Sequence, residues 1–356
     1  MSELNPRTYF FRPSRRTGNE PVLDPVLVAV NASHGIETTL VLDTNLLIAM
    51  ERVVKDGNKT SLLKKYGLHN LVSLLNRCPP NSICISPGLA LDEMPPALAE
   101  RCRLHYEAFC LQHLPSFCDT PNCIHATFSG KEADYGFLDL ESVAQALLAI
   151  PFTALLYLNI VDKQFKGSPI QKFEAFMARM ANDLDMLSTK EIDIAKYCLA
   201  EPPATATETI RLKRLFRTNF LKMKKDKAIR TAQDAMAVAF NGACDLTLIN
   251  SANVIQSRGL DEIPQDCWIA TRDKKLFEFS RVAHYLDLDG NAGQFSLSTV
   301  LTEHMNDEYW IAANDLHQSV SRTRLNYHLS RKIDPFTYVD TAKAAIEETR
   351  LAFQND

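Results

Sequence analysis

Three short apolar segments constrain the fold of this chain more than any other feature of its sequence. They are TTLVL (38–42), SICIS (82–86) and CWIAT (267–271). Uncharged runs of this length are typical of strands that a parallel sheet buries on both faces. Helical patterns separate them, for example at 61–75 and in an alanine-rich stretch at 229–240, and DLTLI (245–249) is a fourth candidate strand. The sequence therefore predicts an α/β fold with a doubly wound parallel sheet.

The same patterns predict one discontinuous core domain with additions. Residues 39–95 and 229–285 form its two halves, which together have the size of a small α/β domain. Between them, 96–228 has helical periodicity interrupted by prolines, which predicts an α-helical insertion. Residues 1–38, punctuated by prolines, are expected to be an irregular N-terminal extension, and 286–356 a helical C-terminal tail.

The spacing of the glycines excludes several large enzyme classes. The chain has 12 glycines in 356 residues, and no two lie within two positions of each other, so G-x-G-x-x-G and G-x-S-x-G motifs are absent. Only Gly130 precedes a lysine, and Glu132 follows that lysine, so there is no Walker A loop. Dinucleotide enzymes, P-loop NTPases and α/β-hydrolases of the usual kind are therefore excluded.

Cysteine content and hydropathy indicate where the protein resides. Nine cysteines, an odd number, favour a reducing compartment, and the first 25 residues lack an apolar core of signal-peptide length. The uncharged run at 143–161 is long enough to span a bilayer. However, Pro151 lies at its centre and amphipathic helical patterns flank it, which favours a buried helix. We expect a cytoplasmic protein without a membrane partner.

Four carboxylates occupy positions at which functional residues of such folds gather. Asp43 follows the first predicted strand, Glu93 lies in a short helix after the second, and Asp273 comes two residues after the third. Asp234 falls in the first turn of the alanine-rich helix. Functional sites of doubly wound sheets lie at the C-terminal ends of the strands. Each acid also has an ordinary explanation, as a turn former, a helix cap or a solvated helix residue.

If these acids converge, their charges require cations. Two carboxylates about 5 Å apart repel by roughly 3 kcal/mol at an effective dielectric constant of 20. An oxygen-only donor set selects one or two Mg²⁺ or Mn²⁺ ions rather than Zn²⁺. A site of this kind with open coordination positions suits phosphodiester hydrolysis.

The segments that carry these acids, VLDTNLLI, ISPGLALDE, TAQDAMAVA and WIATRDKKLF, together resemble the motifs of the PIN-domain nucleases. That family has an acid after its first strand in an Asp-Thr-Asn setting, a mid-chain Glu, an Asp that opens a late helix, and a last Asp in a Thr-x-Asp motif. The matching positions here are Asp43, Glu93, Asp234 and Asp273, with Thr44, Asn45 and Thr271 as polar neighbours. The resemblance implies a PIN-like core in which these acids bind metal and catalyse cleavage, while the neighbours orient the carboxylates.

The resemblance covers the two core halves. It implies a metal-dependent endoribonuclease that leaves 5′-phosphate and 3′-hydroxyl ends. It also implies a toxin or phage-defence role, with an inhibitory protein partner or a homo-oligomer. The chain departs from compact members of the family in the 140 positions between Glu93 and Asp234. This departure leaves Asp92 as an alternative to Glu93.

The segment 211–230 is strongly basic, with nine Lys or Arg residues and one acid, although the whole chain has a net charge of −4. Because it precedes Asp234, we expect it to bind the phosphate backbone of a nucleic acid, and RNA in particular. Phe216 and Phe220 lie within it and are expected to pack inward rather than to stack on bases. The candidate nucleic-acid-binding residues are Arg217, Lys222, Lys224, Lys225, Lys227 and Arg230.

Other interpretations of the sequence depend on specific residues. A cluster of cysteines and histidines comprises Cys102, His105, Cys110, His113, Cys118, Cys123 and His125. Zinc binding by this cluster is disfavoured, because it lacks a Cys-x₂-Cys pair. A phosphatase of the haloacid-dehalogenase kind is also disfavoured, because it needs a second Asp where position 45 is Asn. A structure-specific DNA nuclease and a non-catalytic nucleic-acid-binding protein with the same fold are the remaining alternatives.

Overall fold

The computed structural model divides the chain into two compact units. Unit 1 contains residues 1–135 and 248–297, and unit 2 contains residues 136–247 and 298–356. Helix α11 (Ala232–Arg258) begins in unit 2 and ends in unit 1. The residues that the structure describes are 6–15, 21–116, 135–223, 227–260, 262–288, 291–298, 301–330 and 334–354.

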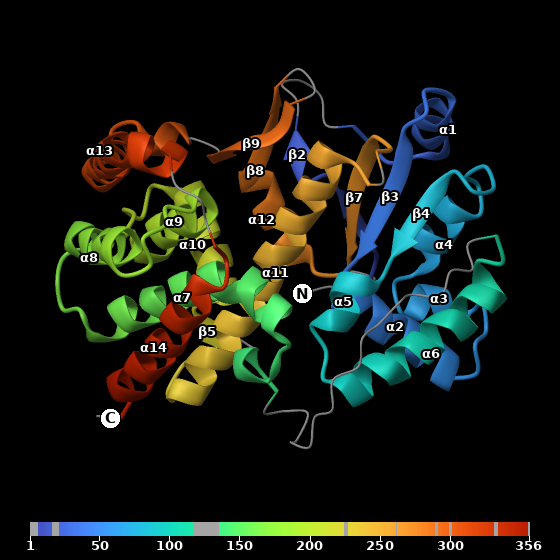
Figure 1. The fold of residues 1–356 in the computed structure, drawn as a ribbon, viewed down its shortest axis with the longest axis horizontal. Coiled ribbons are helices and arrows are strands. Elements are labelled where there is room, and N and C mark those ends of the chain that lie inside the picture. The colour runs from blue at the N-terminus through green and yellow to red at the C-terminus, as the bar shows by residue number, and fades with distance from the viewer. Residues whose placement is uncertain are drawn as a thin grey trace. The chain divides into compact units, whose positions relative to one another are not determined.

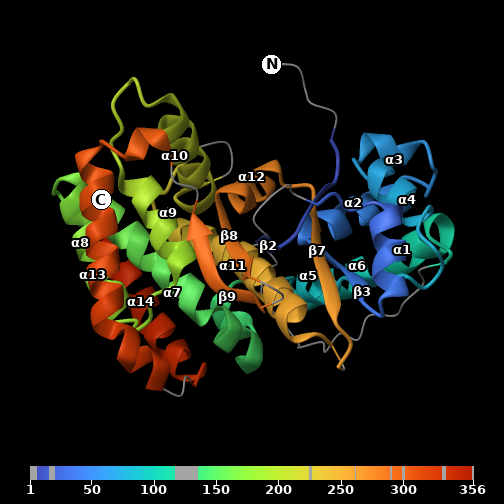
Figure 2. The same ribbon diagram turned by 90° about the horizontal axis from the view of Figure 1, so that it is seen from above.

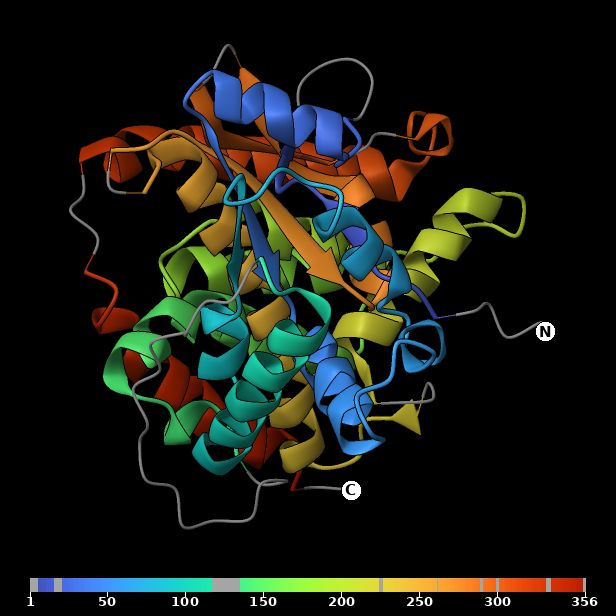
Figure 3. The same ribbon diagram turned by 90° about the vertical axis from the view of Figure 1, so that its right-hand side faces the viewer.

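A four-stranded sheet forms the framework of unit 1 (Figure 1). Its strands lie in the order β1 (Tyr9–Phe11), β7 (Gln265–Thr271), β3 (Glu37–Leu42) and β4 (Ile83–Ser86). Strand β3 is parallel to both β4 and β7, and Figure 3 shows β3 and β7 side by side, whereas β1 is antiparallel to β7. The three strands expected from the apolar segments are confirmed. The sheet is mixed rather than purely parallel, because the N-terminal strand β1 joins its edge.

Helices cover both faces of this sheet. Leu40 and Trp268, which are paired across β3 and β7, belong to one apolar core. That core also includes residues of α1 (Pro25–Ser33), α2 (Thr44–Lys55), α4 (His69–Leu75) and α6 (Pro96–His113). On the other face, Tyr9 and Phe11 contact Phe277 of α12 (Lys274–Val282), with ring centroids 5.0 and 6.2 Å apart. Figure 2 shows α12 on one side of β7 and the helices α1 and α2 on the other.

Several elements differ from the expectations. The N-terminal stretch is not irregular, because it contains β1, β2 (Ser14–Arg15) and α1. The helix expected at 61–75 is divided into α3 (Leu62–Lys65) and α4. The break lies at Gly67, which has a φ of +72° and whose backbone lies so close to Pro6 that a Cβ atom would be within 2.8 Å of it. Glycine meets both demands, since it has no Cβ.

The expected strand at 245–249 is wrong, because these residues lie inside α11. Leu246, Ile249 and Ala252 are all buried at helical spacing, and a short apolar run by itself does not distinguish a buried helix from a buried strand. The helical C-terminal tail also begins later than expected. Strands β8 (Ala283–Leu288) and β9 (Asn291–Ser298) come first and form a second sheet with β2.

Unit 2 is mainly helical in its described part. Besides the first part of α11, it contains α7 (Ser142–Gln164), α8 (Pro169–Asn182), α9 (Thr189–Leu199), α10 (Thr207–Phe220), α13 (Glu308–Ser330) and α14 (Thr337–Ala352). A short hairpin of β5 (Lys222–Met223) and β6 (Lys227–Ala228) follows α10. Residues 190–199 of α9 are all buried, and this helix contacts α7, α8 and α10.

Helix α7 corresponds to the long apolar run. It is long and apolar enough to cross a membrane, but 72% of its apolar window is buried inside the structure. Pro151 lies within the helix and is itself buried, and α14 packs along α7. This environment is that of a core helix and is consistent with a soluble protein.

Candidate functional site

The carboxylate of Asp43 lies at the C-terminal end of β3, where the residue also precedes the first turn of α2. Its side chain is only 6% exposed. Asn45 Nδ2 and Thr271 Oγ1 both donate hydrogen bonds to Asp43 Oδ2, and Asn45 Nδ2 also lies 3.2 Å from Thr271 Oγ1. The backbone N–H of Asn45 also acts on this carboxylate and lowers its pKa.

The loop between β7 and α12 is fixed to the same residues. The backbone N–H of Arg272 donates to Asn45 Oδ1 at 2.8 Å, and that of Asp273 donates to Thr271 Oγ1 at 2.8 Å. Asp273 in turn caps α12, since its Oδ1 accepts from the backbone N–H groups of Lys275 and Leu276 at 2.7 and 3.3 Å. The cap explains this acid in structural terms, and the loop also brings it into electrostatic contact with Asp43.

Glu93 joins the site through Thr44. It follows α5 (Gly88–Asp92), and Thr44 Oγ1 donates to its Oε2 at 2.8 Å. Thr44 is the first residue of α2, so this bond connects Glu93 to the residue next to Asp43. Asp92 is exposed, and in the described part of the chain no hydrogen bond connects it to α2. Of the two candidates, Glu93 is the one connected to the end of β3.

The electrostatics of the site are those of like charges held close together. Burial raises the pKa of Asp43 to about 6, and the charge of Asp273 adds to the rise, while hydrogen bonds from Thr271 and Asn45 oppose it. Burial raises the pKa of Glu93 to about 8, with further contributions from the charges of Asp43 and Asp92. In the described ranges no Lys or Arg forms an ion pair with these acids.

Arg272 is a residue of this site that the sequence analysis missed. Its Nε is buried without a hydrogen-bond partner, and burial together with the charge of Arg52 lowers the pKa of its guanidinium. A buried donor that lacks an acceptor is costly to the folded state. The only sequence signal was its position between Thr271 and Asp273.

No relatives identify the site. Comparisons of the chain with protein-family models, with curated proteins and with solved structures give no match.

The donor set fits a hard divalent cation in its chemistry. The three acids of unit 1 supply oxygen ligands only, and their mutual repulsion would be relieved by a positive charge. In the arrangement described, Asp43 and Glu93 bond to neighbouring hydroxyl and amide groups. Accordingly, among the described residues no group of three or more His, Cys, Asp or Glu side chains has metal-binding geometry. Binding of a cation would require their side chains to rotate.

Asp234 lies in unit 2, at the start of α11. Its Oδ2 accepts hydrogen bonds from the backbone N–H groups of Thr231 and Arg230 at 3.2 and 3.3 Å. Thr231 Oγ1 accepts from the backbone N–H of Asp234 at 3.1 Å, which completes a reciprocal cap. The ordinary structural explanation of this acid is therefore present. Its convergence with the acids of unit 1 stays a prediction.

The basic segment has two kinds of cation. The guanidinium of Arg217 holds Asp162 through two hydrogen bonds of 2.8 and 2.9 Å and also donates to the backbone oxygen of Cys198, so its role is structural. Phe216 and Phe220 are buried, as expected. Lys227 and Arg230 are exposed, and Lys222 is partly exposed on β5. Lys224 and Lys225 lie outside the described residues.

The cysteine and histidine cluster is only partly described. Cys102 lies in the unit 1 core with its Sγ 3.7 Å from Glu51 Oε2, and burial raises the pKa of its thiol to about 12. His113 Nε2 is paired with Asn58 Oδ1 at 2.9 Å, and Cys110 is buried. Cys118, Cys123 and His125 lie outside the described residues.

Proposed function

We propose that the chain is a metal-dependent endoribonuclease with a PIN-like core and a helical insertion. The observation that carries this proposal is the group of acids at the ends of β3 and β7, held by Thr44, Asn45 and Thr271. Burial and like charge raise the pKa of two of them, as expected of a site that is completed by cations. The α/β framework and the order of the acids along the chain also support it.

In this proposal Asp43, Glu93 and Asp273 hold one or two Mg²⁺ or Mn²⁺ ions, and a role of Asp234 in metal binding stays a prediction from the sequence. Such ions lower the pKa of a bound water and stabilise the leaving oxygen. Asn45 and Thr271 donate to Oδ2 of Asp43 and thereby orient its carboxylate. Glu93, positioned by Thr44, orients the attacking water.

The substrate is held by cations of the chain. The backbone N–H of Arg272 holds Asn45, which in turn holds the carboxylate of Asp43. Lys222, Lys227 and Arg230 bind phosphates farther along the strand. We propose RNA as the substrate and the cytoplasm as the location, with a toxin or phage-defence role under the control of an inhibitory partner or of self-association. A DNA nuclease is the nearest alternative, since cations held by these acids would act on phosphate oxygens that both polymers share.

The test uses one labelled RNA and the DNA of the same sequence, each incubated with Mn²⁺, with Mg²⁺ or with EDTA. We expect cleavage of RNA that leaves 5′-phosphate ends, requires the metal and is lost in Glu93→Gln. Asp92→Asn is the matched control, because it removes the adjacent acid but leaves the Thr44 contact. Cleavage of DNA alone would support the alternative substrate. Binding without metal-dependent cleavage of either polymer would overturn the enzyme proposal.

A further inference from the structure

A basic cavity of about 770 Å³ lies in unit 1, where the residues before β1 meet the loop between α3 and α4. Four of its lining residues are basic, namely Arg7, Lys64, Lys65 and His69, and none of the lining residues carries a carboxylate. The side chains of these four residues are exposed, so a ligand can reach them directly from solvent. The volume is within the range of about 300–1,000 Å³ that is usual for ligand sites.

Two of these cations lack a compensating charge. Lys65 Nζ pairs with Asp56 Oδ2 at 3.0 Å, so its charge is largely balanced. The guanidinium of Arg7 lies over the ring of Tyr9, 4.7 Å from its centroid, and this contact supplies no counter-ion. Within the described residues no carboxylate is paired with Arg7 or with Lys64. Exposed cations that gather without acids favour a ligand of negative charge.

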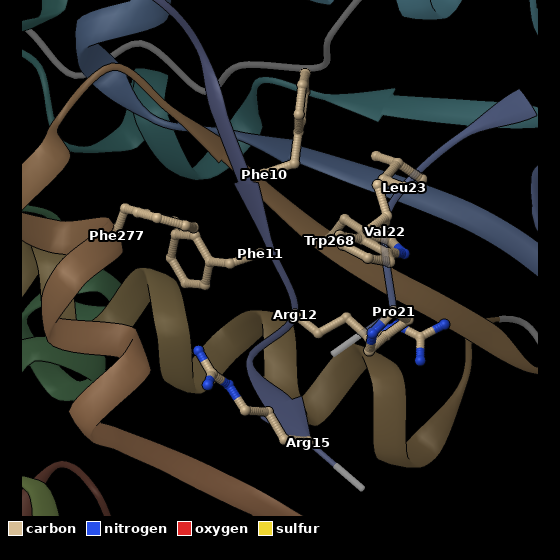
Figure 4. A pocket seen from close by; sticks show the side chains of 9 residues that line it. All are labelled: Phe10, Phe11, Arg12, Arg15, Pro21, Val22, Leu23, Trp268 and Phe277. Atoms are coloured by element: carbon tan, nitrogen blue, oxygen red, sulfur yellow. The ribbon is translucent and has the colours of Figure 1, made fainter. Parts of the chain in front are cut away.

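The walls of the cavity are fixed by hydrogen bonds between the two segments that form it. Thr8 Oγ1 donates to the backbone oxygen of Gly67 at 2.9 Å. Asn70 Oδ1 accepts from the backbone N–H of Thr8 at 3.1 Å, and Asn70 Nδ2 donates to the backbone oxygen of Thr8 at 2.6 Å. The strand that follows is anchored as well, since Phe10 and Phe11 point to opposite sides of β1 (Figure 4). The cavity is therefore formed before any ligand binds, which lowers the cost of binding.

Strand β1 connects this cavity to the acid site. Tyr9 of β1 is paired with Thr271 of β7, and Thr271 donates a hydrogen bond to Asp43. Because β1 is antiparallel to β7, the residues before Tyr9 continue beyond the edge at which β3 and β7 end. Neighbouring strands are about 4.8 Å apart, so β1 lies about 10 Å from β3, on the far side of β7. The cavity and the acids therefore lie at the same edge of one sheet.

We propose that this cavity binds the phosphate backbone of the RNA strand whose cleaved bond lies at the acid site. The identity of the ligand rests on the proposed function, whereas its binding can be measured without cleavage. The guanidinium of Arg7 offers parallel N–H donors to one phosphate, and Lys64 neutralises another. A strand carries a phosphate at each nucleotide, so a few nucleotides suffice to reach from the acids to Arg7. The nearby acids favour a phosphate polymer over an acidic peptide, because metal ions bound there would act on phosphates.

The test is fluorescence anisotropy with a short labelled single-stranded RNA and the full-length Asp43→Asn protein at several salt concentrations. We expect the cavity variant Arg7→Gln/Lys64→Gln to weaken binding at least about fivefold and to reduce the slope of log K against log salt concentration by about 1.4, since each phosphate contact with a single strand contributes about 0.7. Lys64→Gln alone should reduce the slope by about 0.7, and this variant decides if Arg7→Gln does not fold.

The matched control is Arg77→Gln/Lys59→Gln, which removes the same charges from exposed positions of unit 1 that do not line the cavity. It should retain the affinity and the slope of the parent protein. Equal effects of the two double variants, or an unchanged slope in the cavity variant, would overturn the proposal. Equal competition by a poly-glutamate peptide of the same charge would also overturn it, because the cavity would then be a site for acidic peptides.

Cleavage by the protein with an intact Asp43 separates this proposal from the proposed function. If that protein cleaves RNA, but the cavity variant binds and cleaves RNA as the control does, the cavity proposal alone fails. If it cleaves no RNA, but the cavity variant alone loses affinity and slope, the proposed function fails and the cavity is still supported as a site for nucleic-acid phosphates.

Discussion

Each unit of the molecule buries a cluster of charged side chains, and the two clusters follow opposite principles. In unit 1, Asp43, Glu93 and Asp273 bring together charges of one sign, and their neighbours are hydroxyl and amide groups rather than cations. Burial and like charge raise the pKa of Asp43 and of Glu93. This cluster is therefore unfavourable when all its members are ionised.

In unit 2, helix α9 buries two acids and two lysines. Lys196 Nζ lies 3.5 Å from Asp193 Oδ1 and contacts Asn314 Oδ1 at 3.0 Å and His317 Nδ1 at 3.1 Å. Burial lowers the pKa of Lys190 to about 7, while the charges of Glu191 and Asp193 oppose that change. Burial also raises the pKa of Glu191, and the charge of Lys190 opposes that rise. The formal charges of the two acids and two lysines sum to zero, so each acid has a cation on the same helix.

If the proposed function is correct, the difference separates a structural cluster in unit 2 from a catalytic one in unit 1. Opposite charges stabilise one another in a low-dielectric interior, and removal of one partner leaves an uncompensated charge. Like charges lack this compensation and favour a ligand of opposite sign. Substitutions in unit 1 should therefore affect activity more than stability, and substitutions in α9 should do the reverse.

The largest expected effect is that of Asp43→Asn on cleavage. Loss of this carboxylate should lower the rate of RNA cleavage at least about 1,000-fold, or about 4 kcal/mol in activation free energy. The free energy of unfolding of the metal-free protein should not decrease, because a buried charge beside Asp273 is removed. Single-turnover cleavage and urea denaturation measure the two quantities. If the variant unfolds more easily than the parent, or still cleaves RNA, the proposed difference between the two clusters is wrong.

Lys196→Met should have the opposite profile. It leaves Asp193 buried without its ion pair, which should lower the free energy of unfolding by about 3 kcal/mol. The cleavage rate of the folded fraction should stay unchanged. Lys343→Met is the control, because the pair of Lys343 with Asp340 is exposed and contributes little. Equal stability of the two variants would show that the α9 cluster is not structural.

The dependence of stability on pH and metal sharpens the comparison. Both acids are more easily protonated in the folded state, with pKa values of about 6 for Asp43 and about 8 for Glu93. The unfolded chain therefore loses protons first, and the free energy of unfolding should fall by about 1 kcal/mol per pH unit between about pH 4.5 and pH 8. Mn²⁺ should restore stability at pH 8 much more than at pH 5. Calorimetric Tm values measured with Mn²⁺ or EDTA across this pH range test the prediction. In Asp43→Asn, both the decrease of Tm with pH and the stabilisation by Mn²⁺ should be smaller.

Much of the unit 1 framework could be predicted from the sequence. Its central strands are buried in the sheet, so each is encoded by a short uncharged run. The run at 245–249 has the same local composition, but it continues a long helix whose buried side is set by packing. Strand β1 could not be predicted, since its pairing with β7 joins residues more than 250 positions apart.

The site was predictable to the extent that strand ends define it. The proximity of Asp43, Asn45 and Thr271 could be predicted, because β3 and β7 are parallel neighbours that end at the same edge of the sheet. Asp234 could not be assigned, because one pattern encodes both a helix cap and a metal ligand. The structural role of Arg217 depends on Asp162, 55 residues away, which local sequence does not reveal.

The smallest expected effect concerns the cations of unit 2 that lack an acidic partner. In the described residues no carboxylate pairs with Lys222 or Lys227, in contrast to Arg217, which holds Asp162. Replacing both lysines by Gln in the inactive Asp43→Asn protein should weaken RNA binding a few-fold. It should also reduce the slope of log K against log salt concentration by about 1.4, since each phosphate contact with a single strand contributes about 0.7. Fluorescence anisotropy at several salt concentrations measures the slope.

Arg217→Gln is the control. It should mainly lower the free energy of unfolding instead, because it leaves Asp162 without its ion pair. If the lysine variant retains the parent slope, the hairpin does not contact the nucleic acid.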